Sequence, residues 1–548
     1  MRRFTVFAVT AVAAAVLVAA ALAVTFVDVQ TNDPQVAGDP TSNTTARFPT
    51  NKSNEPSIAV NPLNANFLVA GANDEQRQPP CGPGPIRGDV PASDCSFFPG
   101  VGSDGFYTSS TGGTSWVNRG LLPGYSEFPG EPGTLVSDGD PRIVYGPAPD
   151  ANGSFAGARS QDAFVNGARV YYGGLASFAA NAAKGNQVPE LLAVSSSDDN
   201  GVTWSDPVVA ANGHGFLFND HEDVWAEKNP ASPFFGRVYI SFTHFRGSAF
   251  TFFAEPIRVA FSDDGGQTWS TPTQISPAHN NNTVGGRQDS TVRTGPDGTV
   301  YVAWDDGDIN GNKQVVAISH DGGVSFSKPI RVAPLTGIAD PIPGANFRDG
   351  SYPSLGVDQR AGSHTLYDAW AESVGGVGKI LVAKSTDGGL TWSSPVVASR
   401  TTDGYAFFQG LDVAPNGRVD LGYQALKAKS TSTYGTGNAK INSFYTQSTD
   451  GVNWSQSVKV TTAPSDPAVS AQNNLERQFW GDYNTLVSTN ANAWFIYTDS
   501  RNGQGCAAVD DFQHGIDGSG PATTKPAPPD VCPAQFGNSD TFVSKITP

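Results

Sequence analysis

A short pattern that returns along the 548-residue chain is the feature that most restricts its fold. It consists of a serine, an aspartate two positions later, a glycine two positions after that, and an aromatic residue three positions further on. Complete copies begin at Ser197, Ser262, Ser319 and Ser385, and two altered copies begin at Ser109 and Ser448. A unit that recurs with connections of unequal length indicates a repeat architecture, in which each repeat packs against its neighbours.

The sequence around each copy indicates about four short strands per repeat. A run of β-forming residues leads into the pattern, as at 257–262 and 379–385, and a further short strand is expected after it. Upstream of the copy at 319, two more runs are joined by the turn signal Pro296-Asp297-Gly298. Four antiparallel strands per repeat are typical of a propeller blade. We therefore predict an all-β protein with a single β-propeller.

The number of blades follows from the inner strands. Candidates begin near residues 55, 140, 221, 289, 352, 409 and 481. Seven blades are therefore predicted, and six would result if the first or last unit were incomplete. The seventh unit lacks the repeated pattern, and we expect the terminal segment 540–546 to supply its outer strand.

The aspartates of the pattern are expected to be structural. A carboxylate in a tight turn accepts backbone N–H groups, as in Asx-turns. We therefore place these residues in turns between the third and fourth strands of their blades, away from catalysis. They are Asp199, Asp264, Asp321, Asp387 and Asp450.

The charge balance argues against a nucleic-acid partner. The chain has 34 Lys and Arg residues against 51 Asp and Glu, a formal net charge of −17, and its longest basic run is Arg2-Arg3. Such a chain repels phosphate backbones. We expect a monomer.

The N-terminus has the features of an export signal. Arg2 and Arg3 precede an apolar run from Phe4 to Val27, which contains the small-x-small triplet 21–23. We predict that residues 1–28 are a signal peptide or a retained membrane anchor, that 29–50 are a flexible linker, and that 51–548 form the propeller. No second apolar span of about 20 residues follows, so membrane contact is limited to that anchor. The protein is expected to be secreted or tethered outside the cytoplasm.

Four cysteines agree with export: Cys81, Cys95, Cys506 and Cys532. Four cysteines allow three disulfide connectivities, and the sequence leaves all three open. The simplest pairing is local, with one bridge in each of the loops near 76–100 and 503–535. The absence of a Cys-x-x-Cys motif argues against zinc or thioredoxin-like chemistry.

The repeated pattern resembles the Asp-box of the BNR superfamily of sialidases and sialidase-like propellers, and the resemblance covers residues 51–548. It implies exo-glycosidase chemistry in which three arginines bind the substrate carboxylate. It also implies a tyrosine nucleophile backed by a glutamate and an aspartate as acid/base. The Arg-Ile-Pro motif of sialidases is absent, and Pro141-Arg142-Ile143 is its nearest counterpart.

Candidate site residues stand where the inner strands begin, because ligand sites of propellers lie near the axis on one face. The resemblance implies substrate-binding roles for Arg142, Arg287, Arg348, Arg477, Trp480 and Tyr352. It implies Tyr483 or Tyr352 as nucleophile, with Glu222 or Glu476 as its partner, and Asp140, Asp289 or Asp482 as acid/base. Two alternatives remain open: a non-catalytic propeller that binds glycan, protein or cell-wall ligands, and a scaffold in which these arginines and aspartates pair between blades.

Metal ligands are limited to one candidate. Asp306, Asp308 and Asn310 match the first half of a calcium loop, but Ala317 occupies the position of the bidentate glutamate. Calcium is therefore one interpretation and a plain hairpin loop the other, and no cofactor is required. His214 and His221 have no third ligand in a zinc motif.

Overall fold

The structure is a computed structural model. It describes residues 24–34, 52–76, 103–125, 135–155, 164–179, 191–213, 217–248, 251–277, 286–307, 311–345, 347–429, 437–470, 479–505 and 539–548. Within these ranges no helix is long and apolar enough to cross a membrane. Residues 1–23 of the predicted leader and all four cysteines lie outside these ranges, as do Asp308, Asn310, His214, Glu476 and Arg477.

Seven antiparallel sheets form the ring of a β-propeller, as predicted, and each contains a path of four strands running from the axis outwards. The first blade contains β2 (Ser53–Val60), β3 (Leu68–Asp74), β4 (Ser103–Ser109) and β5 (Val117–Leu121), and the second contains β6 (Leu135–Pro147), β7 (Ala168–Phe178), β8 (Leu191–Ser197) and β9 (Val208–Asn212). The third contains β10 (Leu217–Ala226), β11 (Val238–Ser248), β13 (Ile257–Ser262) and β14 (Thr273–Gln274). The fourth contains β15 (Arg287–Thr294), β16 (Val300–Asp306), β17 (Lys313–Ser319) and β18 (Ile330–Pro334). In the third blade β12 (Thr251–Ala254) also pairs with β11.

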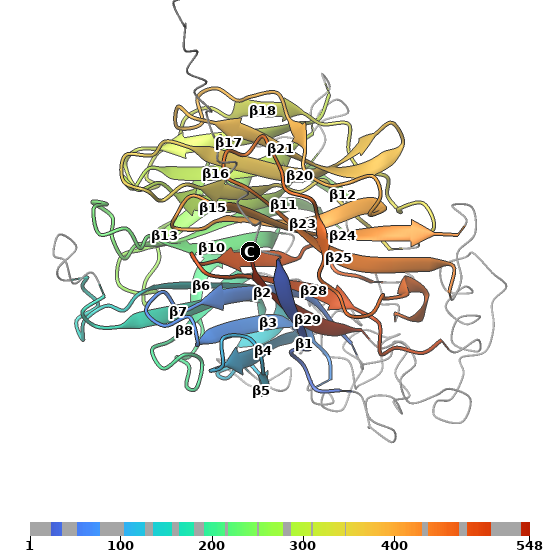
Figure 1. Cartoon of the computed structure of the whole chain (residues 1–548). Helices are drawn as coiled ribbons and strands as arrows, with labels where there is room; N and C mark the ends of the chain where they lie inside the picture. The colour runs from blue at the N-terminus through green and yellow to red at the C-terminus, as the bar shows by residue number, and fades with distance from the viewer. Residues whose placement is uncertain are drawn as a thin grey trace, which may run out of the picture.

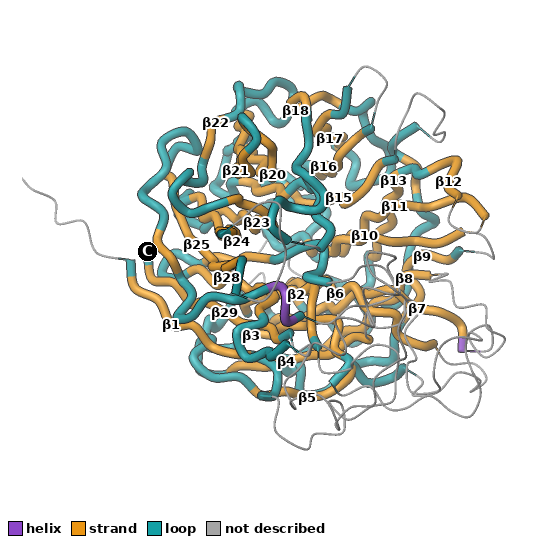
Figure 2. The backbone as a smooth tube through the Cα atoms, turned by 90° about the vertical axis from the view of Figure 1, so that its right-hand side faces the viewer, coloured by secondary structure: helices purple, strands orange, loops and turns teal. Residues whose placement is uncertain are grey.

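The remaining three blades complete the circle. The fifth blade contains β19 (Ser354–Val357), β20 (Leu366–Val374), β21 (Val377–Ser385) and β22 (Val396–Val397). The sixth contains β23 (Tyr405–Val413), β24 (Val419–Ala428), β25 (Ala439–Ser448) and β26 (Val458–Lys459). The seventh contains, from the axis outwards, β27 (Thr485–Ser488), β28 (Ala493–Asp499), β29 (Asp540–Thr547) and β1 (Thr25–Gln30). Figure 2 shows the inner strands β2, β6, β10, β15 and β23 around the centre and the outer strands β5, β18 and β22 at the periphery.

The seventh blade corrects two predictions. The C-terminal strand β29 is its third strand, and the outer strand is β1, which pairs with β29 from Thr25 opposite Thr547 to Gln30 opposite Phe542. The two strands lie side by side in Figure 1. The propeller therefore begins at Thr25 rather than at residue 51, because the ring is closed by pairing the two ends of the chain. The boundary predicted at residue 28 between leader and linker falls inside this strand.

The aspartates of the repeated pattern make the predicted turns between third and fourth strands. In the second blade Asp199 accepts the N–H groups of Val202 at 3.0 Å and Thr203 at 2.8 Å. In the fifth blade, hydrogen bonds from the Thr391 side chain and N–H lower the pKa of Asp387. In antiparallel blades the turns after the first and third strands lie on one face, and the inner strands begin on the other. The patterned aspartates are thus remote from the start of the inner strands.

Candidate functional site at the propeller axis

One residue from each inner strand forms a ring around the axis, which we call the axial ring. Each member lies two positions before the residue at which regular pairing with the second strand starts or resumes. The members are Glu55, Asp140, His221, Asp289, Tyr352, Phe408 and Tyr483. Three carboxylic acids, an imidazole, two phenols and the phenyl ring of Phe408, each from a separate blade, are thereby brought to one place.

The backbone at this ring is strained in five of the seven blades. Pairing with the second strand is interrupted by a bulge there, and the ring residues have φ values of 53° at Glu55, 62° at Asp140, 52° at His221, 49° at Asp289 and 43° at Phe408. Positive φ is unfavourable for residues other than glycine and is found mainly where the surrounding structure enforces it, often at functional sites. Bulges also re-aim side chains.

Glu55 and Asp140 lie side by side at the boundary of the first two blades. Their carboxyl groups hydrogen-bond to one another, and the Asn73 side-chain amide donates to both. The backbone N–H of Asp140 donates to the Asn73 side chain at 2.6 Å. Burial raises the pKa of Glu55 well above its usual range, and the Asp140 charge raises it further. Burial together with the Asp220 charge raises the pKa of Asp140 to about 7.

His221 connects this pair with the fourth blade. Its Nδ1 lies 3.1 Å from Asp289, and its Nε2 lies 3.8 Å from Asp220. Burial opposes protonation of the imidazole, but the charges of Asp220 and Asp289 outweigh it and raise the pKa of His221 well above its ordinary value. The ring is therefore a chain of hydrogen bonds and ion pairs that runs from Glu55 to Asp289.

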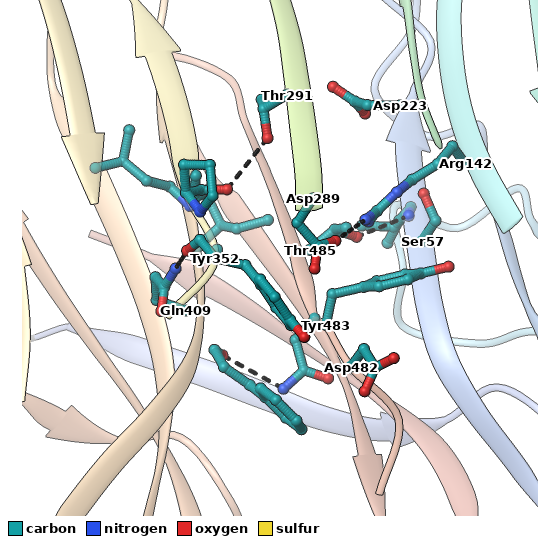
Figure 3. Close-up of a pocket in the computed structure, with 18 of the residues that line it drawn as sticks. Ser57, Arg142, Asp223, Asp289, Thr291, Tyr352, Gln409, Asp482, Tyr483 and Thr485 are labelled. Atoms are coloured by element: carbon teal, nitrogen blue, oxygen red, sulfur yellow. Dashed lines mark hydrogen bonds and ion pairs between the residues drawn. The ribbon is translucent and has the colours of Figure 1, made fainter. Parts of the chain in front are cut away.

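Two arginines flank the ring. The Arg142 guanidinium stacks on the ring of Tyr483 at 3.4 Å and donates through Nε to the carbonyl of Glu222 at 2.9 Å (Figure 3). One of its Nη atoms lies 3.9 Å from Asp289. On the other side, Arg348 binds the Asp482 carboxylate with two N–H groups, the Nε contact being 2.8 Å. A bidentate guanidinium contact of this kind is strong and geometrically specific.

A small polar cavity of about 90 Å³ lies below the ring, lined by inner-strand residues of all seven blades. Figure 3 shows Asp289, Tyr352 and Tyr483 from different blades around it. The residues two positions after the ring hold adjacent blades together through their side chains. Ser57 accepts from Ile143 N–H at 3.0 Å, Asp223 from Val292 N–H at 2.9 Å, Ser354 from Leu411 N–H at 2.9 Å, and Thr485 from Ile58 N–H at 3.1 Å. The ring is thus supported by a rigid scaffold.

Most of the substrate-binding and acid residues predicted from the sequence gather at this ring, but Arg287 does not. It is 2% exposed, pairs with Asp306 at 3.2 Å, and lines a separate groove with Lys313. Side chains alternate along a strand, and the bulge at Asp289 changes this alternation, so Arg287 points away from the axis. The predicted convergence of three arginines is wrong in this respect. Arg477 lies outside the described residues.

Of the predicted tyrosine–glutamate pairs, the one with Glu222 is not formed among the described residues, and Glu476 lies outside them. The Tyr483 hydroxyl donates to the carbonyl of Pro141 at 3.2 Å, and burial raises its pKa well above the usual value. Neither carboxyl oxygen of Glu222 has a hydrogen-bond partner within the described ranges. Trp480 is fully buried and donates to Gln424 at 2.8 Å, so it packs the sixth and seventh blades instead of facing a ligand.

The calcium-loop interpretation is left as a prediction. Asp306 forms its ion pair with Arg287, and the other two candidate ligands lie outside the described residues. Among the residues that the structure does describe, no group of three or more acidic, histidine or cysteine side chains could hold a metal.

Sequence reasoning missed two residues of the candidate site. His221 was considered only as a zinc ligand, although it stands at the same offset from its strand as Glu55 and Asp140, and that offset was the available signal. Asn73, which binds both carboxyl groups, lies on the second strand of the first blade and carries no recognisable motif.

The fold and the site define a seven-bladed propeller with a charged axial ring. No family model matches the chain, and no curated protein matches it. Among solved structures it is similar to a protein of unknown function from Dyadobacter fermentans, at 15% identity over 73% of this chain and 94% of that chain, with a TM-score of 0.40. It is similar to the leech intramolecular trans-sialidase, at 14% identity over 72% and 67%, with a TM-score of 0.40. A third is the Penicillium chrysogenum α-L-arabinanase, at 10% identity over 69% and 90%, with a TM-score of 0.40. At these values the likenesses carry no argument about activity.

Proposed function

We propose that this protein is a secreted, carbohydrate-active propeller that binds the end of a glycan over its axial ring and hydrolyses the terminal glycosidic bond. In its specific form the proposal is a sialidase-type exo-glycosidase that acts on a terminal acidic sugar. The observation that carries it is the half-buried Asp140, whose carboxyl group lies against that of Glu55 at the mouth of the axis and has a pKa raised to about 7.

The chemical argument begins with the proton that glycoside hydrolysis requires. A carboxylic acid must protonate the leaving oxygen, and a second group on the other side of the sugar must stabilise or attack the anomeric carbon. A carboxyl group with a pKa of about 7 retains its proton on a large fraction of molecules at neutral pH and suits the first role. Burial and the Asp220 charge maintain this pKa, whereas the Glu55 side chain lowers it, so Asp220 is a positioning residue.

We assign the second role to Asp482, at the start of the seventh blade. Asp482 is held by the Arg348 fork next to Glu55, because the backbone at Gly481 approaches the side chain of Glu55. Arg348 is one-third exposed, and it and Arg142 are the cations available for a sugar carboxylate. Guanidinium groups match carboxylates in geometry.

The dimensions of the cavity limit how the sugar is bound. Ligand pockets that enclose a small molecule have volumes of roughly 300–1,000 Å³, whereas the axial cavity has about 90 Å³. A sugar ring therefore lies above the ring residues, against the half-buried Asp140, Asp220, Tyr352 and Arg348. Only a substituent or water molecules enter the cavity.

The test is turnover of fluorogenic α-sialosides and a panel of other exo-glycosides, with and without calcium. Asp140→Asn is the informative variant, because asparagine tolerates positive φ and retains the contact with Asn73. We expect kcat to fall by at least roughly 100-fold, the usual contribution of a general acid. Asp206→Asn, an exposed aspartate in the second blade, is the control and should retain full activity. Absence of turnover on every glycoside would refute hydrolysis.

A second candidate function is glycan binding without catalysis. It is favoured by the observation that Arg348 is already paired with Asp482 and that Tyr483 donates to a backbone carbonyl. This reading predicts that a glycan binds over the ring and is recovered unchanged. Binding measured by calorimetry together with zero turnover would establish it over the hydrolase.

A further inference from the structure

A second concave surface lies away from the axis, between the third and fourth blades. It is a groove of about 1,130 Å³, with β14 on one side and β16, β17 and β18 on the other. This volume exceeds the roughly 300–1,000 Å³ of pockets that hold drug-sized ligands. The groove can therefore accommodate several units of a chain molecule.

The charge of the groove is opposite to that of the protein. Among the described residues, its lining contains the cations Arg287, Lys313, Lys328 and Arg331 and one acidic residue, Asp306, which pairs with Arg287. The whole chain carries 51 acidic against 34 basic residues. A local excess of cations on an acidic protein attracts anions to this place and repels them elsewhere.

Strand pairing fixes the cations along one direction. Arg331 of β18 is opposite Val315 of β17, and Lys313 lies two residues further along the same strand. Lys313 and Arg331 therefore lie near one another on the sheet, on either side of a register shift between Gln314 and Val315. Lys328 and Arg331 are exposed, and the half-buried ring of Phe326 lies beside them. The groove thus presents spaced cations next to an apolar surface.

We propose that this groove binds an acidic oligosaccharide, in which carboxylate or sulfate groups meet the cations and the apolar faces of the sugars lie against Phe326. The site does not depend on chemistry at the axial ring. Spaced cations fit a chain with one charge per one or two sugars. A nucleic acid carries far denser charge along a long backbone, and the surrounding net negative charge repels it.

The experiment measures binding of labelled oligogalacturonide, a sulfated oligosaccharide, a neutral oligogalactan and a single-stranded oligonucleotide to the purified protein at two salt concentrations. The groove variant is Lys328→Glu with Arg331→Glu. Its control is Lys440→Glu with Lys459→Glu, which makes the same change in net charge at exposed positions of the sixth blade.

We expect one or both acidic oligosaccharides to bind, with affinity that decreases at higher salt. The groove variant should weaken binding by roughly tenfold or more, while the control leaves it unchanged. Comparison of the oligogalacturonide with the sulfated oligosaccharide then shows whether the groove prefers carboxylate or sulfate groups. Asp140→Asn should bind as well as the wild type whether or not the axial site is catalytic.

Three results would overturn the proposal. One is the absence of binding by either acidic oligosaccharide, and another is an equal loss in the groove and control variants. The third is equal or tighter binding of the neutral oligosaccharide or the oligonucleotide, which would assign the groove to a different class of partner.

Discussion

Replacing Asp28 with alanine tests how the ring is closed. Asp28 lies on β1 and its carboxylate is fully buried. It accepts a hydrogen bond from the Tyr497 hydroxyl at 2.7 Å and two from Thr462, through its N–H and its hydroxyl, each at 2.8 Å. It also forms an ion pair with Arg501. This one side chain therefore joins the N-terminal strand to the last two blades.

The expected magnitude follows from these contacts. Removing one partner of a buried ion pair costs about 3–5 kcal/mol, because the remaining charge is left uncompensated. Arg501 keeps Asp499 as a second partner, whereas the buried Tyr497 hydroxyl keeps only Ser544. We therefore expect the lower end of the range, a loss of about 3 kcal/mol in the free energy of unfolding.

The assay is denaturant and thermal unfolding, followed by limited proteolysis at β29. Val27→Ala is the control, because Val27 lies on the same strand and is 46% exposed. A chain that begins at Val24 should match the full protein, whereas one that begins at Thr31 lacks β1 and should expose the edge of β29 to protease. If Asp28→Ala were no more destabilising than Val27→Ala, the closure inferred from β1 would be wrong.

Three further predictions concern single side chains. Asp368 is buried with both carboxyl oxygens unpartnered in the described structure, and burial raises its pKa to about 8. The folded state thus keeps a proton that the unfolded state releases above pH 4, so the free energy of unfolding should decrease as the pH rises from about 4 to 8. Calorimetry on Asp368→Leu should show a weaker dependence of stability on pH. This variant should also be more stable than the wild type at pH 7, by about 1–3 kcal/mol. Asp220→Asn removes the largest charge that raises the pKa of Asp140, so the basic limb of the pH profile of kcat/KM should move to lower pH; an unmoved limb would exclude Asp140 as the titrating acid. Asp387→Ala should lower the free energy of unfolding by about 1 kcal/mol, because the turn contacts with Thr391 are lost, and should leave activity unchanged. A loss of activity as large as that of Asp140→Asn would contradict a purely structural role.

The repeat made the propeller predictable, because each copy of the pattern marks the turn between the third and fourth strands of one blade. The positions of the other strands of that blade follow from this turn. Closure was not predictable. The sequence of β1 runs on from the apolar leader, so its strand character is hidden, and the C-terminal strand was assigned to the wrong position in the blade. Pairing of strands that lie at opposite ends of the chain leaves no local signal.

The site was predictable in its residue types but not in its contacts. Asp140, Asp289 and Tyr483 were recognised because polar and aromatic residues stand where the inner strands begin. Which of these side chains contact one another depends on the bulges in the inner strands. The bulges require positive φ values at residues other than glycine, and the sequence does not reveal these values. Arg287 illustrates the point, since only one residue separates it from Asp289, yet it faces a different groove.

The central claim is that the axial ring is where the protein binds its sugar. The most direct test is a crystal structure of the Asp140→Asn variant soaked with the oligosaccharide that the wild type turns over or binds most tightly. The account predicts a terminal sugar above the ring, within hydrogen-bonding distance of residue 140 and of Arg348. A sugar bound only at another surface, with the axial mouth unoccupied, would contradict it.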